Sequence, residues 1–346
     1  MEATNIHNLK RLIREVNRTH KGLGPLIGLN LVAAKANKCV LNVAPAGTGK
    51  SVTTDTVVGI LKGDAMKFTS ITLAGLVRLK AEFQGYRGCV CIDDLGAEKS
   101  DWSRTSTVEC ISTLVHTHFV RKVTQTSEVR IDDFYGSAIM NIQPILLYSI
   151  IKDTSWIAVV RDKVIRAYHL VRPVHPALMQ HTPQIDWTTS VAAVEFPSHK
   201  GKLWWQLVAI ALTQWSYGRV IEHLPDLLRA CAAIDGRKRV EAEDYRILIK
   251  LLRPMVLERY LVDTAGFETG REFNDNLLCM LVEIVTHGNP SFETICEDYK
   301  CSPRTVDTVV AQLPIWFWIQ KDGVKRVLPT EYCKNILKLV GAYQTW

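Results

Sequence analysis

The sequence feature that most constrains the fold is the octapeptide APAGTGKS at residues 44–51, which follows a strand-like run and opens a helix-like one. Its alanines and glycines let backbone N–H groups close around a phosphate without Cβ clashes. The N-terminus of the following helix adds positive partial charge. Lys50 would reach the terminal phosphates, and the Ser51 hydroxyl would bind Mg²⁺.

This segment therefore predicts a phosphate-binding loop (P-loop) rather than a ligand-free Gly-rich turn, although Ala44 stands where the common pattern has glycine. The residues predicted to bind the nucleotide are Ala44, Pro45, Ala46, Gly47, Thr48, Gly49, Lys50, Ser51 and Val52.

A second motif, CVCIDDLG at residues 89–96, is an apolar run that ends in two adjacent carboxylates about forty residues after Lys50. Two carboxylates at a strand end are costly unless a cation neutralises them. We therefore predict that Asp93 holds Mg²⁺ together with Ser51, and that Asp94 orients or deprotonates an attacking water. The alternative is a surface turn with solvated acids. Many ATPases carry glutamate at the position of Asp94, and aspartate is one methylene shorter. The shorter side chain is expected to affect the rate of hydrolysis more than the binding of the nucleotide.

The pattern of apolar residues predicts an α/β fold, a parallel sheet with helices on both faces. Strands are expected at 38–44, 66–72, 88–93 and 136–141, with a short strand pair at 123–131. The helices expected between them cover 50–62, 73–83 and 103–121. An amphipathic helix is expected at 5–20, followed by a Gly/Pro-containing stretch that leads into the core. From about residue 200 the pattern is helical, at 201–215, 219–235, 241–262 and 274–286.

Composition bounds the remaining possibilities. A chain of 346 residues is expected to form two or three domains. No apolar run is long enough to cross a bilayer, and the first residues lack the apolar core of a signal peptide. The nine cysteines contain no CxxC pair and are expected to be reduced thiols. We therefore expect an intracellular protein, in the cytoplasm or in the nucleus or nucleoid, with no membrane partner. The net charge of +7 is compatible with nucleic acid but does not establish it.

Taken together, the two motifs resemble those of AAA+ P-loop ATPases, over roughly residues 25–260. On this resemblance APAGTGKS and CVCIDDLG correspond to the Walker A and Walker B motifs. GSAIMN (136–141) resembles the strand that ends in sensor 1, with Asn141 helping to place the water, although a strand-end cap is an alternative for Asn141. The resemblance implies that ATP and Mg²⁺ are the cofactors and that the chain hydrolyses ATP.

The resemblance also suggests arginines that act on the nucleotide. RDKVIR (161–166) resembles the segment that supplies an arginine finger to a neighbouring subunit, with Arg161 the first choice and Arg166 the second. A solvated surface arginine is the alternative for Arg161. Residues 216–252 resemble the helical lid of such ATPases. Arg219, at the start of a lid helix, fits sensor 2, and Arg229 is the alternative.

Residues 274–340 resemble a winged helix. Residues 290–313 have a helix–turn–helix pattern in which Ser302 would cap the second helix and Pro303 would occupy its first position. The aromatic run 316–329 predicts a hairpin around Asp322–Gly323. The predicted DNA contacts are Arg304, Lys321, Lys325 and Arg326, with Thr308 as a further candidate.

Charge gives this DNA interface mixed support. Residues 300–346 carry a net charge of +4, whereas residues 274–299 carry five acids and no Lys or Arg. A DNA-binding face therefore requires the acids to lie on the opposite side, and docking to a protein is the alternative. DNA could instead pass through the centre of an oligomer.

The lid pattern resembles minichromosome maintenance helicases, origin-recognition ATPases and the Holliday-junction motor, whereas DDLG is more similar to bacterial helicase loaders and transposition ATPases. These resemblances imply a DNA motor, helicase or helicase loader. It would form a ring or filament, with a hexamer expected, and would work with a helicase or another replication or transposition protein. The alternatives are a signalling-type NTPase switch and a non-catalytic DNA-bound regulator. The expected domains are an N-terminal helix, an ATPase core, a lid and a winged helix, at 1–24, 25–190, 191–265 and 266–346.

Overall fold

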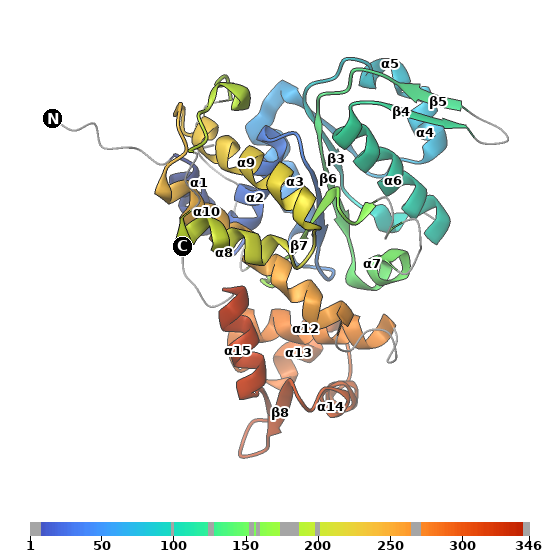
Figure 1. Cartoon of the computed structure of the whole chain (residues 1–346). Helices are drawn as coiled ribbons and strands as arrows, with labels where there is room; N and C mark the ends of the chain where they lie inside the picture. Colours follow the sequence, from blue (N-terminus) through green and yellow to red (C-terminus); the bar gives the residue numbers. More distant parts are fainter. Residues whose placement is uncertain are drawn as a thin grey trace.

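The computed structural model describes most of the chain, namely residues 8–97, 100–123, 128–151, 156, 160–173, 187–197, 201–263 and 271–341. Figure 1 shows an α/β body that carries the sheet, with the C-terminal helices and a hairpin against one end of it. No helix within these residues is long and apolar enough to span a bilayer.

The centre of the body is a five-stranded parallel sheet with the order β2-β3-β6-β1-β7. The strands are β1 Cys39–Val43, β2 Ala65–Phe68, β3 Cys89–Ile92, β6 Ser137–Ile142 and β7 Val164–Tyr168. The predicted α/β fold with a parallel sheet is confirmed. Strand β6 lies between β1 and β3, so it separates the strand before the P-loop from the strand before the acidic pair.

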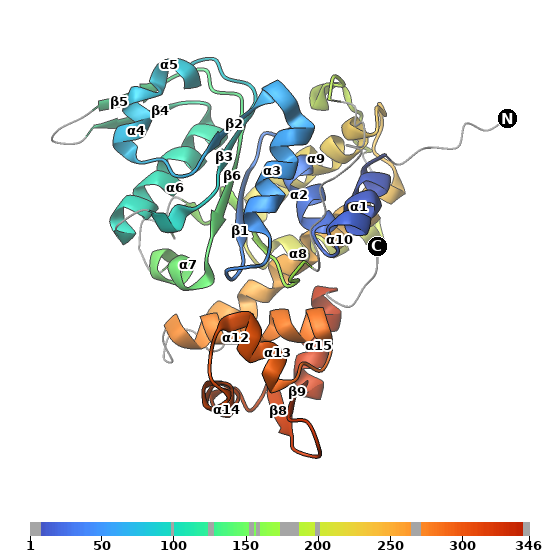
Figure 2. The same ribbon diagram turned by 180° about the vertical axis from the view of Figure 1, so that it is seen from behind.

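Helices cover both faces of the sheet, as predicted (Figures 1 and 2). The connecting helices are α3 Lys50–Leu61, α4 Leu73–Arg78, α5 Lys80–Phe83, α6 Asp101–Thr117 and α7 Pro144–Ile151. Alternate residues of each strand enter two cores, because successive side chains of a strand point to opposite faces. A separate antiparallel pair, β4 Val120–Val123 and β5 Glu128–Ile131, forms the strand pair expected near 123–131.

The Gly/Pro-containing stretch after the first helix is itself a buried helix, α2 Gly24–Lys35, which the sequence analysis did not assign. Pro25 sits in its first turn, where the missing N–H costs nothing. A Cβ on Gly28 would lie 2.8 Å from Ile13 Cδ1, so glycine lets α2 approach α1 Asn8–Thr19 closely. The predicted apolar face of α1 is buried as expected.

Helices α8 Lys202–Ala211, α9 Tyr217–Ile234 and α10 Ala242–Leu252 share a core with α1 and α2. The single helix predicted at 241–262 is wrong in its extent. It breaks after α10 into a 3₁₀ turn, η5 Arg253–Val256, and a π-helical turn, η6 Arg259–Asp263. Pro254 has no N–H to continue the α-helical hydrogen bonds, which accounts for the break.

The described residues of the C-terminal part, 271–341, form four helices and one hairpin, and α12 lies between the body and the hairpin (Figure 2). Its elements are α12 Arg271–His287, α13 Phe292–Tyr299, α14 Pro303–Gln312, β8 Phe317–Gln320, β9 Arg326–Pro329 and α15 Glu331–Val340. Ser302 Oγ accepts the Thr305 N–H at 3.2 Å and Pro303 begins α14, so the predicted cap is confirmed. The predicted hairpin is also present.

Candidate nucleotide-binding site

The P-loop lies at the carboxyl edge of the sheet, between the end of β1 and the first residue of α3. Gly47 and Gly49 have φ angles of +73° and +83°, a region that favours glycine. A Cβ on Gly47 would lie 2.6 Å from Arg172 Nη1, and one on Gly49 would lie 2.9 Å from Pro173 Cγ. The loop therefore favours glycine at both positions for conformation, and at Gly49 also for space, because the nearest atom at Gly47 is the movable end of the Arg172 side chain.

The Lys50 side chain folds back onto the first residues of this loop. Its Nζ donates to the carbonyl oxygens of Ala44 at 2.5 Å and Pro45 at 2.7 Å. The Thr48 hydroxyl donates to the same Pro45 carbonyl at 2.8 Å. Burial lowers the pKa of Lys50 to about 8, opposed mainly by the negative charge of Asp94. A phosphate held in the loop would place negative charge next to the half-buried Lys50 ammonium and would stabilise its charged form, as the nearby acidic side chains do.

The acidic pair follows β3 as predicted, and backbone hydrogen bonds to the last residue of β2 and to the residue after it hold the pair in place. The Asp93 N–H donates to Phe68 O at 2.9 Å and the Asp94 N–H to Thr69 O at 3.0 Å. Asp94 Oδ1 accepts the Gly96 N–H at 2.7 Å, which fixes the orientation of this carboxylate. Both carboxylates therefore lie at the same edge of the sheet as the P-loop. Strand β6 lies between β3, which precedes the carboxylates, and β1, which precedes the P-loop.

Asn141, near the end of β6, fills this intervening position and is fully buried. Its Nδ2 donates to Asp93 Oδ1 at 3.2 Å and to Thr54 Oγ1 at 2.8 Å. Its Oδ1 accepts from Asn42 Nδ2 at 3.0 Å. These three bonds go to side chains, so Asn141 ties the Asp93 carboxylate to α3 and β1.

A cavity of about 540 Å³ opens where these elements meet. It is lined by P-loop residues and by Asp93, Asp94, Gln143, Arg172 and Pro173. Backbone N–H groups, an ammonium and a guanidinium suit a polyphosphate, whereas Ser51 and Asp93 offer the hard oxygen ligands that Mg²⁺ prefers. The residues present therefore fit a magnesium nucleotide.

A larger hollow of about 760 Å³ lies at the other edge of the sheet, beside the first residues of β1, β3 and β6. Ligands of open α/β sheets bind outside the carboxyl ends of the strands. The smaller cavity, which holds the P-loop and the acidic pair, is therefore the candidate nucleotide site.

The structure corrects the second choice for the arginine finger. Arg166 lies within β7, is 0% exposed, and forms an ion pair with Glu258 at 2.6 Å. It therefore cannot reach a neighbouring subunit. Arg161 is exposed in the turn before β7, at the sheet edge opposite its own P-loop. Its role in a second subunit stays a prediction.

The two sensor 2 candidates lie away from the cavity. Arg219 Nη1 pairs with Glu222 at 2.6 Å, and Arg229 Nη1 lies 3.7 Å from Asp226. Glu222, Asp226 and Arg229 line the larger hollow at the opposite edge. This arrangement gives no support to either assignment. Among the described residues that line the nucleotide cavity, the basic side chains are those of Lys50 and Arg172. Sequence reasoning missed Arg172 because a lone arginine before a proline matches no motif.

The predicted DNA contacts, Arg304, Lys321, Lys325 and Arg326, are all exposed on α14 and the hairpin. Lys325 Nζ lies 3.5 Å from an Asp307 carboxylate oxygen, and Arg326 Nη1 donates to Asn289 O at 2.9 Å. Of the aromatic run 316–318, Trp316 and Phe317 are buried, whereas Trp318 is exposed.

Three of the five acids of residues 274–299 face the body rather than the hairpin. Glu283 and Asp298 pair with Arg172, and Asp275 accepts the backbone N–H of Ile145. These three acids therefore lie on the side away from the basic residues of the hairpin, as a DNA-binding face requires.

Comparison of the chain with protein-family models and with curated proteins finds no match to either.

The low pKa of Lys50 predicts how nucleotide affinity depends on pH. A bound phosphate stabilises the charged ammonium and raises its pKa, so binding above pH 8 must take up a proton. We expect the affinity for Mg·ATP to fall between pH 8 and 9.5 by up to about tenfold per unit, and this ammonium to impose no pH dependence below pH 7. Equilibrium binding at a series of pH values measures this. Lys50→Arg, which stays charged, should give a flat profile, and an equally steep one would mean that another group titrates.

Proposed function

We propose that this protein binds and hydrolyses ATP with Mg²⁺, as an AAA+ ATPase. The observation that carries the proposal is the meeting of the P-loop and the Asp93–Asp94 pair around one cavity at the carboxyl edge of the sheet, where the buried Asn141 donates a hydrogen bond to Asp93. In this proposal Lys50 binds the β- and γ-phosphates, and Ser51 and Asp93 hold Mg²⁺. Asp94 accepts a proton from the attacking water, which Asn141 helps to place.

We further propose that α8–α10 form the lid and residues 271–341 a winged helix that contacts DNA. The exposed basic residues of α14 and the hairpin support a DNA interface. Figure 1 shows the hairpin at the end of the C-terminal part that lies away from the sheet. The protein would assemble on DNA inside the cell as a ring or filament, as a motor, helicase or helicase loader. Arg161 would act on the nucleotide of the neighbouring subunit.

The decisive measurement is ATP hydrolysis with no DNA, with single-stranded DNA and with double-stranded DNA, using Lys50→Ala as the blank. We expect hydrolysis above the blank and stimulation by one form of DNA. Hydrolysis that is indifferent to both forms would contradict the DNA motor while leaving the ATPase intact. No hydrolysis above the blank would leave a protein that at most binds nucleotide.

Binding to DNA is tested in parallel with the double variant Lys321→Gln/Arg326→Gln. Each lost phosphate contact should lower the slope of log affinity against log salt by about one. Lys334→Gln, which removes an exposed lysine of α15 that pairs with Glu331, is the matched control. Equal slopes for the wild type and the double variant would show that the hairpin does not contact DNA.

One observation favours the alternative of a signalling-type switch. The C-terminal helix α12 contacts the nucleotide region through Asp275 and Glu283. A C-terminal unit that holds the nucleotide site closed would retain ADP through purification. Mass-spectrometric detection of stoichiometric ADP in the purified protein, together with hydrolysis that ignores DNA, would favour this alternative over the DNA motor.

A further inference from the structure

Arg172 is placed between the P-loop and the C-terminal helices. It follows β7 in the extended segment 169–173 and lines the nucleotide cavity. Its Nη1 lies 3.5 Å from the carbonyl oxygen of Gly47 in the centre of the P-loop. The guanidinium therefore stands where a polyphosphate bound in the loop would meet it.

The other side of the same guanidinium is held by the C-terminal part. Its Nη2 and Nε donate to Glu283 Oε1 at 3.2 and 3.3 Å, and Nε lies 3.5 Å from Asp298 Oδ2. The Tyr299 ring lies 4.9 Å away, and the Arg172 N–H donates to Thr286 Oγ1 at 2.9 Å. Arg172 thus joins α12 and α13 to the rim of the P-loop.

Glu283 depends on Arg172 for its charge. Its side chain is 0% exposed, and burial raises its pKa, an effect that Arg172 opposes. Its Oε2 accepts no hydrogen bond from the residues that the structure describes and lies 3.5 Å from His287 Nε2. Removing Arg172 would leave a buried carboxylate without its nearest permanent cation, which is strongly unfavourable.

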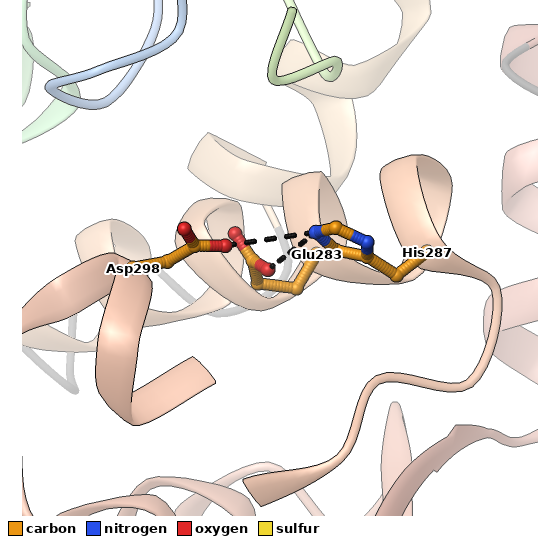
Figure 3. Close-up of side chains that lie close together, drawn as sticks. All are labelled: Glu283, His287 and Asp298. Atoms are coloured by element: carbon orange, nitrogen blue, oxygen red, sulfur yellow. Dashed lines mark ion pairs between the residues drawn. The ribbon is translucent and has the colours of Figure 1, made fainter. Parts of the chain in front are cut away.

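Figure 3 shows Glu283, His287 and Asp298 turned toward one another, a grouping that has the spacing of a metal site. Arg172 already places a full positive charge 3.2 Å from Glu283 and 3.5 Å from Asp298. A metal ion would have to share these acids with the guanidinium at close range. The cluster is better explained as the counter-charge of Arg172.

A second contact joins α12 to the site. Burial raises the pKa of Asp275, whereas its hydrogen bond from the Ile145 N–H and the charge of Lys50 lower it. The same carboxylate charge favours the protonated form of Lys50. Helix α12 is therefore joined to the body near the site at two places, through Arg172 and through the Ile145 N–H.

We propose that Arg172 is a latch that opens when ATP binds. The proposal rests on the proposed function, because the competing ligand is the polyphosphate of Mg·ATP in the P-loop. Phosphate oxygens accept charge-assisted hydrogen bonds from arginine in a forked geometry and compete with Glu283 and Asp298 for the guanidinium. As Arg172 turns to the phosphate, the buried Glu283 loses its partner and α12 loosens from the body. The coupling is reciprocal: the factor by which bound ATP weakens the contact of Arg172 with Glu283 and Asp298 equals the factor by which loss of that contact strengthens ATP binding.

The first test is the affinity for Mg·ATP of Glu283→Gln, which keeps the shape of the side chain but removes its charge. We expect ATP to bind about tenfold more tightly than to the wild type, within the usual range of coupling between sites. Asp226→Asn is the control for the loss of one ion-paired carboxylate, because Asp226 pairs with Lys38 at 2.7 Å at the other edge of the sheet. The control should bind ATP like the wild type.

The second test is hydrogen exchange of residues 275–299 in the wild-type chain. Mg·ATP should speed exchange in α12, and Arg172→Gln should show fast exchange there without nucleotide and no further change with it. Unchanged exchange in α12 on ATP binding, with unaltered affinity in Glu283→Gln, would overturn the latch but not the ATPase. A wild-type chain that binds no Mg·ATP would overturn both.

Discussion

Replacing Lys50 with alanine is expected to abolish detectable binding of Mg·ATP, a loss of at least about a thousandfold, or about 4 kcal/mol. Lys50 is one of the two basic side chains, among the described residues, that line the cavity. Alanine would leave the phosphate charge in a partly buried site without its nearest cation, where electrostatic interactions are stronger than in water. The carbonyls of Ala44 and Pro45, which accept from the Lys50 ammonium, would then face the phosphate directly.

Calorimetric titration with Mg·ATP measures this loss, and circular dichroism verifies that the variant is folded. Lys80→Ala, which removes an exposed lysine of α5, is the control for a change of one positive charge. It should bind ATP like the wild type. A Lys50→Ala variant that binds within fivefold of the wild type would mean that the loop is not the phosphate site.

Most of the sheet could be predicted because β1, β3 and β6 are mainly apolar, whereas the half-buried β2 ends at Phe68, earlier than the predicted strand at 66–72. Strand β7 was the exception, since RDKVIR was interpreted as a finger-bearing segment. A charged residue inside a strand argues against burial unless a partner is known. The partner of Arg166 is Glu258, which lies 92 residues further along the chain. No local pattern connects the two, so only the folded chain reveals that Arg166 is buried.

Errors elsewhere in the fold have equally local causes. The stretch that forms α2 contains glycines and a proline, which are typical of a loop, yet the proline sits in the first turn and the glycines face α1. Tertiary packing outweighed the weak helix propensity. In the helix predicted at 241–262, the proline at 254 was the available signal for the break.

The residues of the candidate site also differ in whether a local sequence pattern could identify them. Residues within the two contiguous motifs, together with Asn141, could be found by sequence because the backbone geometry of a P-loop demands particular residues at fixed spacing. Arg172 and Gln143, which line the cavity, could not, because each comes from a segment that carries no motif. The arginine that lines the cavity follows β7, whereas the lid arginines chosen by resemblance lie elsewhere.

Asp94→Asn is expected to slow ATP hydrolysis by about 10³- to 10⁴-fold, at the upper end of what a general base contributes. Asparagine keeps the size of the side chain, and its Oδ1 can still accept the Gly96 N–H that orients Asp94. The amide cannot take a proton from water, so the chemical step suffers while the cavity keeps its shape. The affinity for Mg·ATP should stay within about threefold of the wild type, because Asp94 is assigned no contact with metal or phosphate.

Single-turnover phosphate release and equilibrium binding separate the two effects, and Asp64→Asn controls for the loss of one exposed acid. Because ATP would bind but persist, the variant should also accumulate the ATP-bound assembly, seen as a larger species by light scattering. Asp93→Asn should behave differently. It removes a proposed metal ligand, so ATP affinity should fall in the presence of Mg²⁺ and change little with EDTA. If Asp94→Asn hydrolyses ATP normally while Asp93→Asn does not, the proton acceptor is Asp93 or a group outside this pair.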